Sequence, residues 1–408
     1  MVELGRVAIN LDTRRVPVKE SDRVPGPYPY YGASGVVDHV NGYLFDGDYL
    51  LVAEDGENLR TRQTPVAFMA TGKFWVNNHA HILEGGERAR TRYLAYALSV
   101  ADIAGYLTGA VMPKLTQANL ARIPIPLPGL EEQDKIVGIL GSLDDKIELN
   151  RRMAATLEEA ARALFKSWFI DFDPIHAKAH NQPTGLPHAI SSLFPSRFGN
   201  DGLPEGWTKA PLLDHARLIS GGTPKTDEPT YWDGPVLWAS AKDVSQCADR
   251  FLISTERTIT RRGLEQSATR LVPARSTVVV ARGATTGRHC LFGREMAMNQ
   301  TCYALHSDAK RPFWLACTFS AMVSDLVRGA HGSVFDTITT TTLQTANLIY
   351  GGDEVVSAFE RSVQPIYERI LNLVEESATL RALRDTLLPK LISGELRVKD
   401  AGATVVAA

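Results

Sequence analysis

The 408-residue chain has few of the features that mark secreted or membrane proteins. Its only cysteines are Cys247, Cys290, Cys302 and Cys317, and their spacing fits neither a C-x-x-C zinc pair nor a secreted disulfide framework. No apolar run reaches the roughly 18 residues that a transmembrane helix needs, and residues 1–15 lack the apolar core of a signal peptide. We therefore expect a cytoplasmic protein with buried thiols.

Net charge and catalytic signatures are also scarce. The formal net charge is -2, so the overall balance does not indicate a nucleic-acid partner. The sequence contains no G-x-x-x-x-G-K-[ST] phosphate loop, no G-x-G-x-x-G turn opening a helix after a strand, no H-E-x-x-H zinc motif and no Asn-Pro-Pro-aromatic stretch of amino-methyltransferases. These absences favour a chain that catalyses nothing itself.

What the sequence does contain is an internal repeat. The stretch GAVMPKLTQANL, residues 109–120, returns as GSVFDTITTTTL, residues 332–343. Four residues recur with a constant offset of 223 positions: Gly109, Val111, Thr116 and Leu120 return as Gly332, Val334, Thr339 and Leu343. Looser matches extend backward from each copy, for example VNNHAHIL with MNQTCYAL. A repeat of this kind predicts two copies of one structural unit.

A long helical pattern follows each copy. From Leu130 to Phe169 and from Val355 to about Leu391, apolar residues recur at steps of 3 and 4 with charges between them, as in a coiled coil. Helices of roughly 35 to 40 residues would be about 55 to 60 Å long. Each has an apolar seam that needs a partner, so we expect the two to pack together, antiparallel.

The expected fold is therefore α+β: two globular domains in tandem repeat, separated by two long helices packed as an antiparallel coiled coil, with a pseudo-two-fold axis. The expected segments are a first domain at 1–128, a spacer helix at 129–170, a linker at 171–203, a second domain at 204–352, a C-terminal helix at 353–398 and a tail at 399–408. Two reading heads at a fixed separation suit a DNA target with two half-sites.

Several segments resemble a known family. These are YPYYGASGVVDHVNGYLFDGDYLLVAEDGENL, IPIPLPGLEEQDKIVGILGSLDDKIELNRRM with LFKSWFIDFDPI, LPEGWTKAPLLDHARLISGGTPKT, and LLPKLISGEL. In them the chain resembles the DNA specificity (S) subunit of Type I restriction-modification systems, over nearly its whole length. One departure is that the first domain begins at VELGRVAINLDTRR, as though residues corresponding to LPEGWTKAP, and with them part of a strand, were missing.

The resemblance implies a non-catalytic, sequence-specific DNA-binding subunit. Each of its two target recognition domains would read one half of a bipartite, asymmetric site in double-stranded DNA. The helices would space these domains and dock two modification methyltransferase subunits, and restriction motor and nuclease subunits would join the complex. S-adenosylmethionine, ATP and Mg are expected on the partner subunits, with no cofactor or metal on this chain.

DNA recognition needs Arg or Lys for phosphates and guanine, Asn or Gln for adenine, and glycine turns for close backbone approach. Neither domain is strongly basic, so local patches must carry binding. The alternative for each candidate is a solvated surface charge or a capping amide. The candidates are Arg14, Arg15, Lys19, Lys73, Asn77, Asn78 and Lys114 in the first domain, and Lys225, Thr226, Lys242, Arg282, Arg288, Asn299 and Gln300 in the second.

Other clusters have less specific patterns. His79 and His81 alternate on an expected strand, where they would share a face, but no third metal ligand accompanies them. The acids Glu54, Asp55 and Glu57 surround a glycine, which indicates a turn rather than a catalytic site. The linker histidines His176 and His180 lie between prolines, so we expect a solvated segment there.

The expected docking site for the partner is aromatic. Phe165, Trp168 and Phe169 cluster at the end of the first long helix, and an exposed aromatic patch is typical of a protein interface. Two other functions remain possible at this stage: a coiled-coil scaffold without DNA recognition, and a self-sufficient nuclease or methyltransferase.

Overall fold

The computed structural model describes residues 1–329 and 337–398, and these residues form two compact units. Unit 1 consists of Met1–Ile147 together with Thr379–Ala408, and unit 2 is Glu148–Ala378. The expected tail 399–408 and part of the second repeat copy, with Gly332 and Val334, lie outside the described residues. Within the described ranges, no helix is both long and apolar enough to cross a membrane.

Unit 1 contains two four-stranded sheets. One has the order β2-β9-β6-β7 and the other β4-β3-β8-β5, and a two-stranded ladder joins β1 to β10. The apolar residues of the central strand β6 are fully buried because both of its neighbours and α2 cover it. The elements are β1 (Val2–Glu3), β2 (Ala8–Asn10), β3 (Pro25–Gly32), β4 (Gly35–Val40), β5 (Phe45–Asp46), β6 (Tyr49–Ala53), α1 (Asn58–Thr61), β7 (Ala67–Ala70), β8 (Lys73–Val76), β9 (Ala80–Gly85), α2 (Thr91–Val100), α3 (Gln117–Arg122) and β10 (Pro124–Ile125).

Unit 2 contains a five-stranded sheet, β12-β20-β17-β18-β14, a four-stranded sheet, β15-β13-β19-β16, and a ladder that joins β11 to β21. Its elements are α5 (Asp173–Ala179), α6 (His188–Ser191), β11 (Thr208–Pro211), β12 (Arg217–Ser220), β13 (Trp232–Ala239), α7 (Ala241–Gln246), β14 (Phe251–Leu252), β15 (Arg257–Ile259), α8 (Arg261–Glu265), β16 (Leu271–Val272), β17 (Thr277–Val280), β18 (His289–Phe292), β19 (Met296–Met298), β20 (Cys302–His306), α9 (Pro312–Gly329), α10 (Thr340–Thr345) and β21 (Asn347–Tyr350).

The two units repeat one topology, which confirms the predicted repeat. The order β2-β9-β6-β7 corresponds to β12-β20-β17-β18, and each second sheet contains one parallel pair, β3 with β8 and β13 with β19. Thr116 and Thr339, which are 223 positions apart, both cap the next short helix by accepting a hydrogen bond from a backbone N–H. Leu120 and Leu343, which lie within those helices, are both buried.

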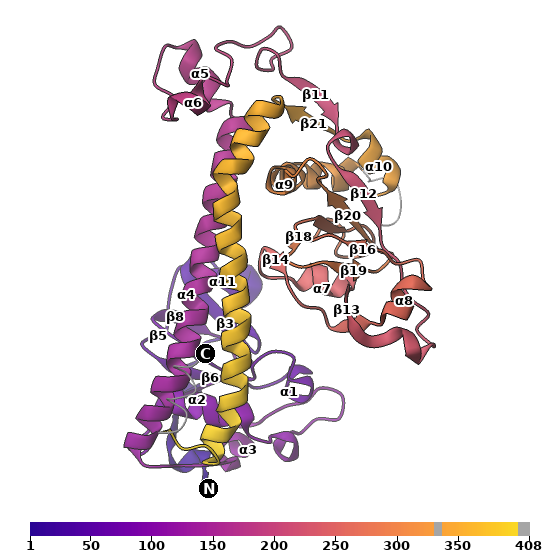
Figure 1. The fold of residues 1–408 in the computed structure, drawn as a ribbon. Helices are drawn as coiled ribbons and strands as arrows, with labels where there is room; N and C mark the ends of the chain where they lie inside the picture. The colour runs from indigo at the N-terminus through magenta and orange to yellow at the C-terminus, as the bar shows by residue number, and fades with distance from the viewer. Residues whose placement is uncertain (330–336, 399–408) are drawn as a thin grey trace. The chain divides into compact units, whose positions relative to one another are not determined.

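The long helices α4 (Leu130–Phe169) and α11 (Asp353–Ser393) contribute to both units. In unit 2 the partners run in opposite directions: Asn150 donates to Glu376 over 2.9 Å, whereas Phe165 packs against Phe359 with ring centroids 5.7 Å apart. In unit 1 Arg384 donates to Asp144 over 2.8 Å. The two helices therefore pack antiparallel, as predicted (Figure 1).

The first strand of unit 1 is shorter than its counterpart. In β1, Val2 pairs with Ile125, whereas β11 extends over four residues and places Ala210 opposite Leu348. Both strands lead into a 3-10 turn that begins with a buried leucine, at positions 4 and 212. The core at this edge is therefore formed in both units, although the two ladders differ in length.

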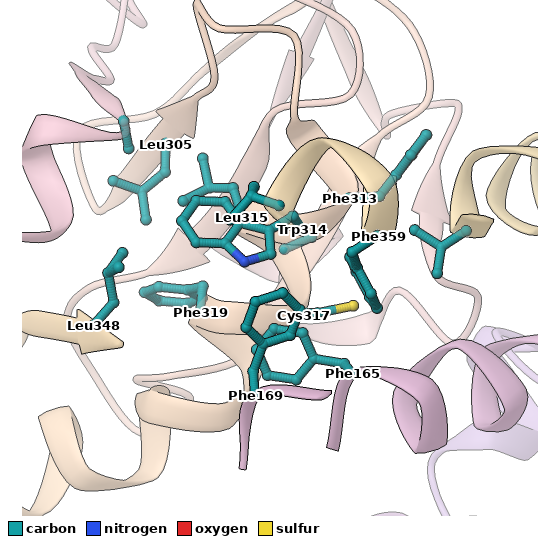
Figure 2. Packing of buried hydrophobic residues seen from close by; sticks show 14 of the residues in the cluster. Phe165, Phe169, Leu305, Phe313, Trp314, Leu315, Cys317, Phe319, Leu348 and Phe359 are labelled. Carbon is teal, nitrogen blue, oxygen red and sulfur yellow. The ribbon is translucent and has the colours of Figure 1, made fainter. Parts of the chain in front are cut away.

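The predicted aromatic docking patch is wrong for the chain by itself. Phe165, Trp168 and Phe169 are buried in the core of unit 2, with no more than 6% of each residue exposed. Figure 2 shows Phe165 and Phe169 directed into a cluster that also contains Phe359 of α11 and Trp314 of α9. The apolar surface therefore stabilises the unit itself.

The predicted linker is also more ordered than expected. It contains the helices α5 and α6. Pro174 is the second residue of α5, a position near the N-terminus where proline is well tolerated. Phe194, which follows α6, packs edge-on against Trp168 at 5.0 Å. His176 lies with its ring 4.7 Å from that of Phe198, yet His176 and His180 are both exposed, as expected for a solvated pair.

Candidate nucleic-acid interface

Three loops of unit 1 meet at one end of its first sheet. They are residues 54–57 after β6, residues 77–79 between β8 and β9, and residues 108–114 before α3. The backbone of Glu54 joins them, because its N–H donates to His79 O over 2.9 Å and its carbonyl accepts from Leu115 N over 2.8 Å. An antiparallel bridge between Asp55 and Lys114 continues the contact. We refer to these residues as the three-loop assembly.

Buried charges hold this assembly against the sheet. His81 on β9 is 1% exposed, and its Nδ1 lies 2.5 Å from Asp12 Oδ2 while its Nε2 lies 2.7 Å from Leu115 O. Since a carboxylate and a carbonyl only accept hydrogen bonds, both ring nitrogens donate and His81 is an imidazolium. Arg15 adds a second cation by donating to Glu54 over 2.8 Å and to the carbonyl of Ala80 over 2.8 Å.

The ionisation of this cluster follows from its contacts. Burial opposes the charge on His81, but the hydrogen bonds to Asp12 and to the Leu115 carbonyl, with the charges of Asp12 and Glu54, raise the pKa of the imidazole. Burial likewise opposes the charge on Asp12, yet the hydrogen bond and charge of His81 lower the pKa of that carboxyl. The pKa of Glu54 is lowered against burial by Arg15, His81 and Lys114. The contacts within the cluster therefore favour the charged form of each of the three groups.

The structure separates the DNA-contact candidates of the first domain into two groups. Arg14, Lys19, Lys73, Asn78 and Lys114 are exposed. Of these, Asn78 and Lys114 belong to the three-loop assembly, and the ammonium of Lys114 lies 3.2 Å from Glu54.

The remaining candidates and two of the exposed ones have internal contacts. Arg15 is bound inside the charged cluster, and Asn77 is 8% exposed and accepts the backbone N–H of His79. The guanidinium of Arg14 lies 4.7 Å from the centre of the Phe45 ring, and the ammonium of Lys73 lies 4.7 Å from that of Tyr43. In this structure, Arg15 and Asn77 support the loops from within and do not project from them.

Among its described residues, unit 2 repeats the backbone bonds that join the three-loop assembly, with different side chains. Ile338 N donates to Ala281 O over 2.9 Å, and Arg282 bridges to Thr337, which matches the bonds around Glu54 and Lys114. The residue opposite Val279 is Tyr303, whereas the residue opposite Val52 in unit 1 is His81. The frame is thus shared, and among the described residues the position of the buried His81 is occupied in unit 2 by Tyr303.

The candidates of unit 2 are mostly exposed. Gln300 accepts from Thr223, Lys242 is paired with Glu256 over 2.8 Å, and Asn299 is half-buried and accepts the hydroxyl of Thr301. Lys225, Thr226, Arg282 and Arg288 have exposed side chains. Arg282 and the Asn299–Thr301 turn come together in the assembly, because Ala281 N donates to Thr301 O over 2.8 Å.

Sequence reasoning missed two features of this site. The acids near Gly56 were interpreted as a turn, but Glu54 is also the buried partner of Arg15 and His81, which lie 39 and 27 positions away and left no local signal. The exposed apolar pair Val111 and Met112 was also missed, although two adjacent apolar residues between a glycine and a proline were visible as such.

Neither metal nor disulfide chemistry is indicated by the described residues. In ranges 1–329 and 337–398, no group of three or more His, Cys, Asp or Glu side chains is arranged to hold a metal ion. His79 and His81 have separate partners, Asp55 and Asp12. Three of the four thiols are buried, and Cys247 is half-buried.

Comparisons with known proteins agree with the repeat. The family model described as the Type I restriction modification DNA specificity domain matches residues 1–159 and again 204–350. The Type I restriction enzyme HindI specificity subunit of Haemophilus influenzae is 27% identical over 337 residues, covering 70% of this chain and 71% of that protein. The MjaIX specificity subunit of Methanocaldococcus jannaschii is 24% identical over 372 residues, covering 86% and 80%.

A solved structure also shares the fold. The S subunit of a Type I restriction-modification system from M. genitalium superposes with a TM-score of 0.56 at 14% identity, covering 96% of this chain and 95% of that one. At this identity, the likeness concerns the fold alone.

Proposed function

Because this chain belongs to the Type I restriction-modification DNA specificity family, we propose that it reads a bipartite, asymmetric site in double-stranded DNA, with one half-site for each repeat domain. The observation that carries the proposal is the set of backbone bonds at Glu54 in unit 1, which recurs at Ala281 among the described residues of unit 2 with different side chains. A common frame with different side chains suits the reading of two unlike half-sites of one polymer.

The chain itself would not catalyse the reaction. Two methyltransferase subunits, with S-adenosylmethionine, would modify the DNA, and motor and nuclease subunits would use ATP and Mg. We expect the complex to work in the cytoplasm, where its DNA substrate is. The buried state of Trp168 and its neighbours leaves the outer faces of α4 and α11 as the proposed docking surface for the methyltransferases.

A binding selection tests this function. The chain is co-purified with its methyltransferase and incubated with a pool of random duplexes, and the bound duplexes are sequenced. A split motif with a fixed gap supports two readers. A duplex pool without enrichment, in the presence of bound partner, would instead support a coiled-coil scaffold that reads no DNA, and modification of DNA by the chain alone would identify a self-sufficient enzyme.

The role of the helices requires a separate test. Inserting one heptad in both α4 and α11 adds about 10 Å to each helix and preserves the coiled-coil seam. We expect the spacer between half-sites to lengthen while both half-sites stay the same. An unchanged spacer in a folded variant would show that the helices do not set it.

A further inference from the structure

The loop before α3 in unit 1 has an exposed apolar tip. Val111 is 95% exposed and Met112 is 63% exposed, and in the described part of 101–147 they are the only large hydrophobic residues that are strongly exposed. Isolated exposed hydrophobics are ordinary on protein surfaces. An adjacent pair at the end of a loop, of which Val111 is almost fully exposed, needs a further explanation.

The tip is held in place by its backbone. Thr108 and Lys114 form two bonds across the loop base, of 2.8 and 2.7 Å, and Gly56 N donates to Pro113 O over 3.1 Å. Gly109 has a φ of +86°, and a Cβ there would lie 2.2 Å from the carbonyl oxygen of Met112, so only glycine fits. The loop is therefore pre-organised to present its two side chains outward.

A cation flanks the tip on each side, Arg60 paired with Glu57 and Lys114 paired with Glu54. Arg60 donates to the carbonyls of Gly109 and Ala110 over 3.0 and 3.3 Å, and its side chain remains 41% exposed. Lys114 follows the tip directly, and its side chain is 50% exposed. Arg60 also covers the carbonyl acceptors of the tip, which leaves the apolar side chains as the groups that face outward.

The size and surroundings of the tip favour DNA over a protein partner. A stable protein interface covers about 800 Å² on each partner, whereas this apolar surface is limited to two side chains and is bordered by the charged residues Arg60, Glu57 and Lys114. A short apolar wedge between cations is the arrangement by which proteins separate stacked base pairs. The tip also belongs to the three-loop assembly, which includes the exposed Asn78.

We propose that Val111 and Met112 form an apolar wedge that enters a groove of the bound duplex and partly unstacks one base step within the half-site read by unit 1. Lys114 and Arg60 would hold the phosphates on either side. This inference rests on the proposed DNA-reading function, and it adds a contact that acts through deformation of the DNA.

The test compares two double variants in the complex with the methyltransferase. Val111→Ser/Met112→Ser removes the wedge, and Ile9→Ser/Val24→Ser removes two exposed hydrophobics elsewhere in unit 1, which are 50% and 56% exposed. Affinity for the selected duplex is measured by fluorescence anisotropy between 50 and 200 mM salt. 2-Aminopurine, placed in turn at each step of the half-site, reports unstacking by increased fluorescence.

We expect the wedge variant to bind about tenfold more weakly, since burial of the two side chains is worth roughly a factor of one hundred and the cost of unstacking the base step offsets part of it. The slope of log affinity against log salt should not change, because no phosphate contact is lost. The 2-aminopurine signal of the wild type at one step should disappear, whereas the control variant should match the wild type in affinity and signal.

Three results would overturn the wedge. The first is that the wedge variant and the wild type have equal affinity and equal 2-aminopurine fluorescence. The second is that the variant loses the methyltransferase while its DNA contacts are unchanged. The third is that the wild-type complex selects no motif. Only the third also removes the proposed function, so the two failures can be distinguished.

Discussion

Replacing His81 by leucine tests whether the buried charged cluster supports the three-loop assembly of unit 1. The change keeps the side-chain volume similar but removes the two hydrogen bonds of the imidazolium, to Asp12 at 2.5 Å and to the Leu115 carbonyl at 2.7 Å. Asp12 would remain buried, with Ile82 N and Arg15 as its remaining partners. Breaking a buried ion pair typically costs about 3 to 5 kcal/mol, and the remaining partners lower our expectation to about 2 to 4 kcal/mol.

The pKa shifts predict how the destabilisation caused by His81→Leu changes with pH. The pKa of His81 is raised in the folded state, so its stabilisation is complete below the unfolded value near 6.5 and is lost as pH rises through the folded value. Asp12 and Glu54 have lowered pKa values, so their contribution is present above about pH 4.5 and is lost in acid. The destabilisation caused by His81→Leu should therefore be largest near pH 6 and should decrease toward pH 9.

Hydrogen exchange measured by mass spectrometry resolves the effect by unit. We expect faster exchange in β6 and β9 of unit 1 and unchanged exchange in β17 and β20 of unit 2. The matched control is His79→Ala, which removes a 51% exposed histidine and its surface contact with Asp55, and such contacts contribute little. If His81→Leu and His79→Ala gave the same small effect at pH 6, the buried cluster would not support unit 1.

Three further predictions concern charge and packing. Lys114→Ala should weaken DNA binding at all sequences and reduce the salt slope by about 1, while Arg15→Ala should leave the slope unchanged and lower stability instead; equal slopes for both would refute the separation. Trp168→Ala should lower the free energy of unfolding of unit 2 by about 3 to 5 kcal/mol, seen in a denaturant titration, and a fully stable variant would contradict its core role. Burial raises the pKa of Glu360 to about 7, against the backbone N–H groups of Phe313 and Trp314. Because that folded value lies above the unfolded one of 4.5, stability is lost as pH rises from about 4.5 to about 7, so Glu360→Gln should raise the melting temperature at pH 8 more than at pH 5; the reverse order would refute the assignment.

The repeat and the long helices were predictable because they depend on periodic apolar patterns. Steps of 3 and 4 located both helices, and a constant offset of 223 positions linked Thr116 to Thr339, which are capping residues at the same place in each unit. Such patterns involve either neighbouring residues or two segments that match in the same order, so a single sequence displays them. The aromatic end of the first helix shows the limit, since the pattern that indicated a partner surface also fits burial under Phe359 and Phe194.

Individual contacts at the candidate interface were less predictable, for a physical reason. Lys114 and Arg15 are both basic and both lie near turns, yet one is half-exposed and the other is 14% exposed between Asp12 and Glu54. The difference arises from the strand register, which places His81 beside Val52 and Glu54 beside His79. Register joins residues far apart in sequence, so composition and spacing alone do not determine which cations face outward.

Comparison of the two units indicates how similar backbone bonds could serve the two unlike half-sites that we propose. The bond from Leu115 N to Glu54 O has its counterpart in the bond from Ile338 N to Ala281 O, so the backbone positions of the loops are fixed without side chains. Side chains can then differ without disturbing these backbone bonds. They do differ, since Glu54 belongs to an ion cluster whereas Ala281 is apolar. Unlike side chains on equal frames would give the two domains different base preferences and the same approach to the duplex, which is what an asymmetric bipartite site requires.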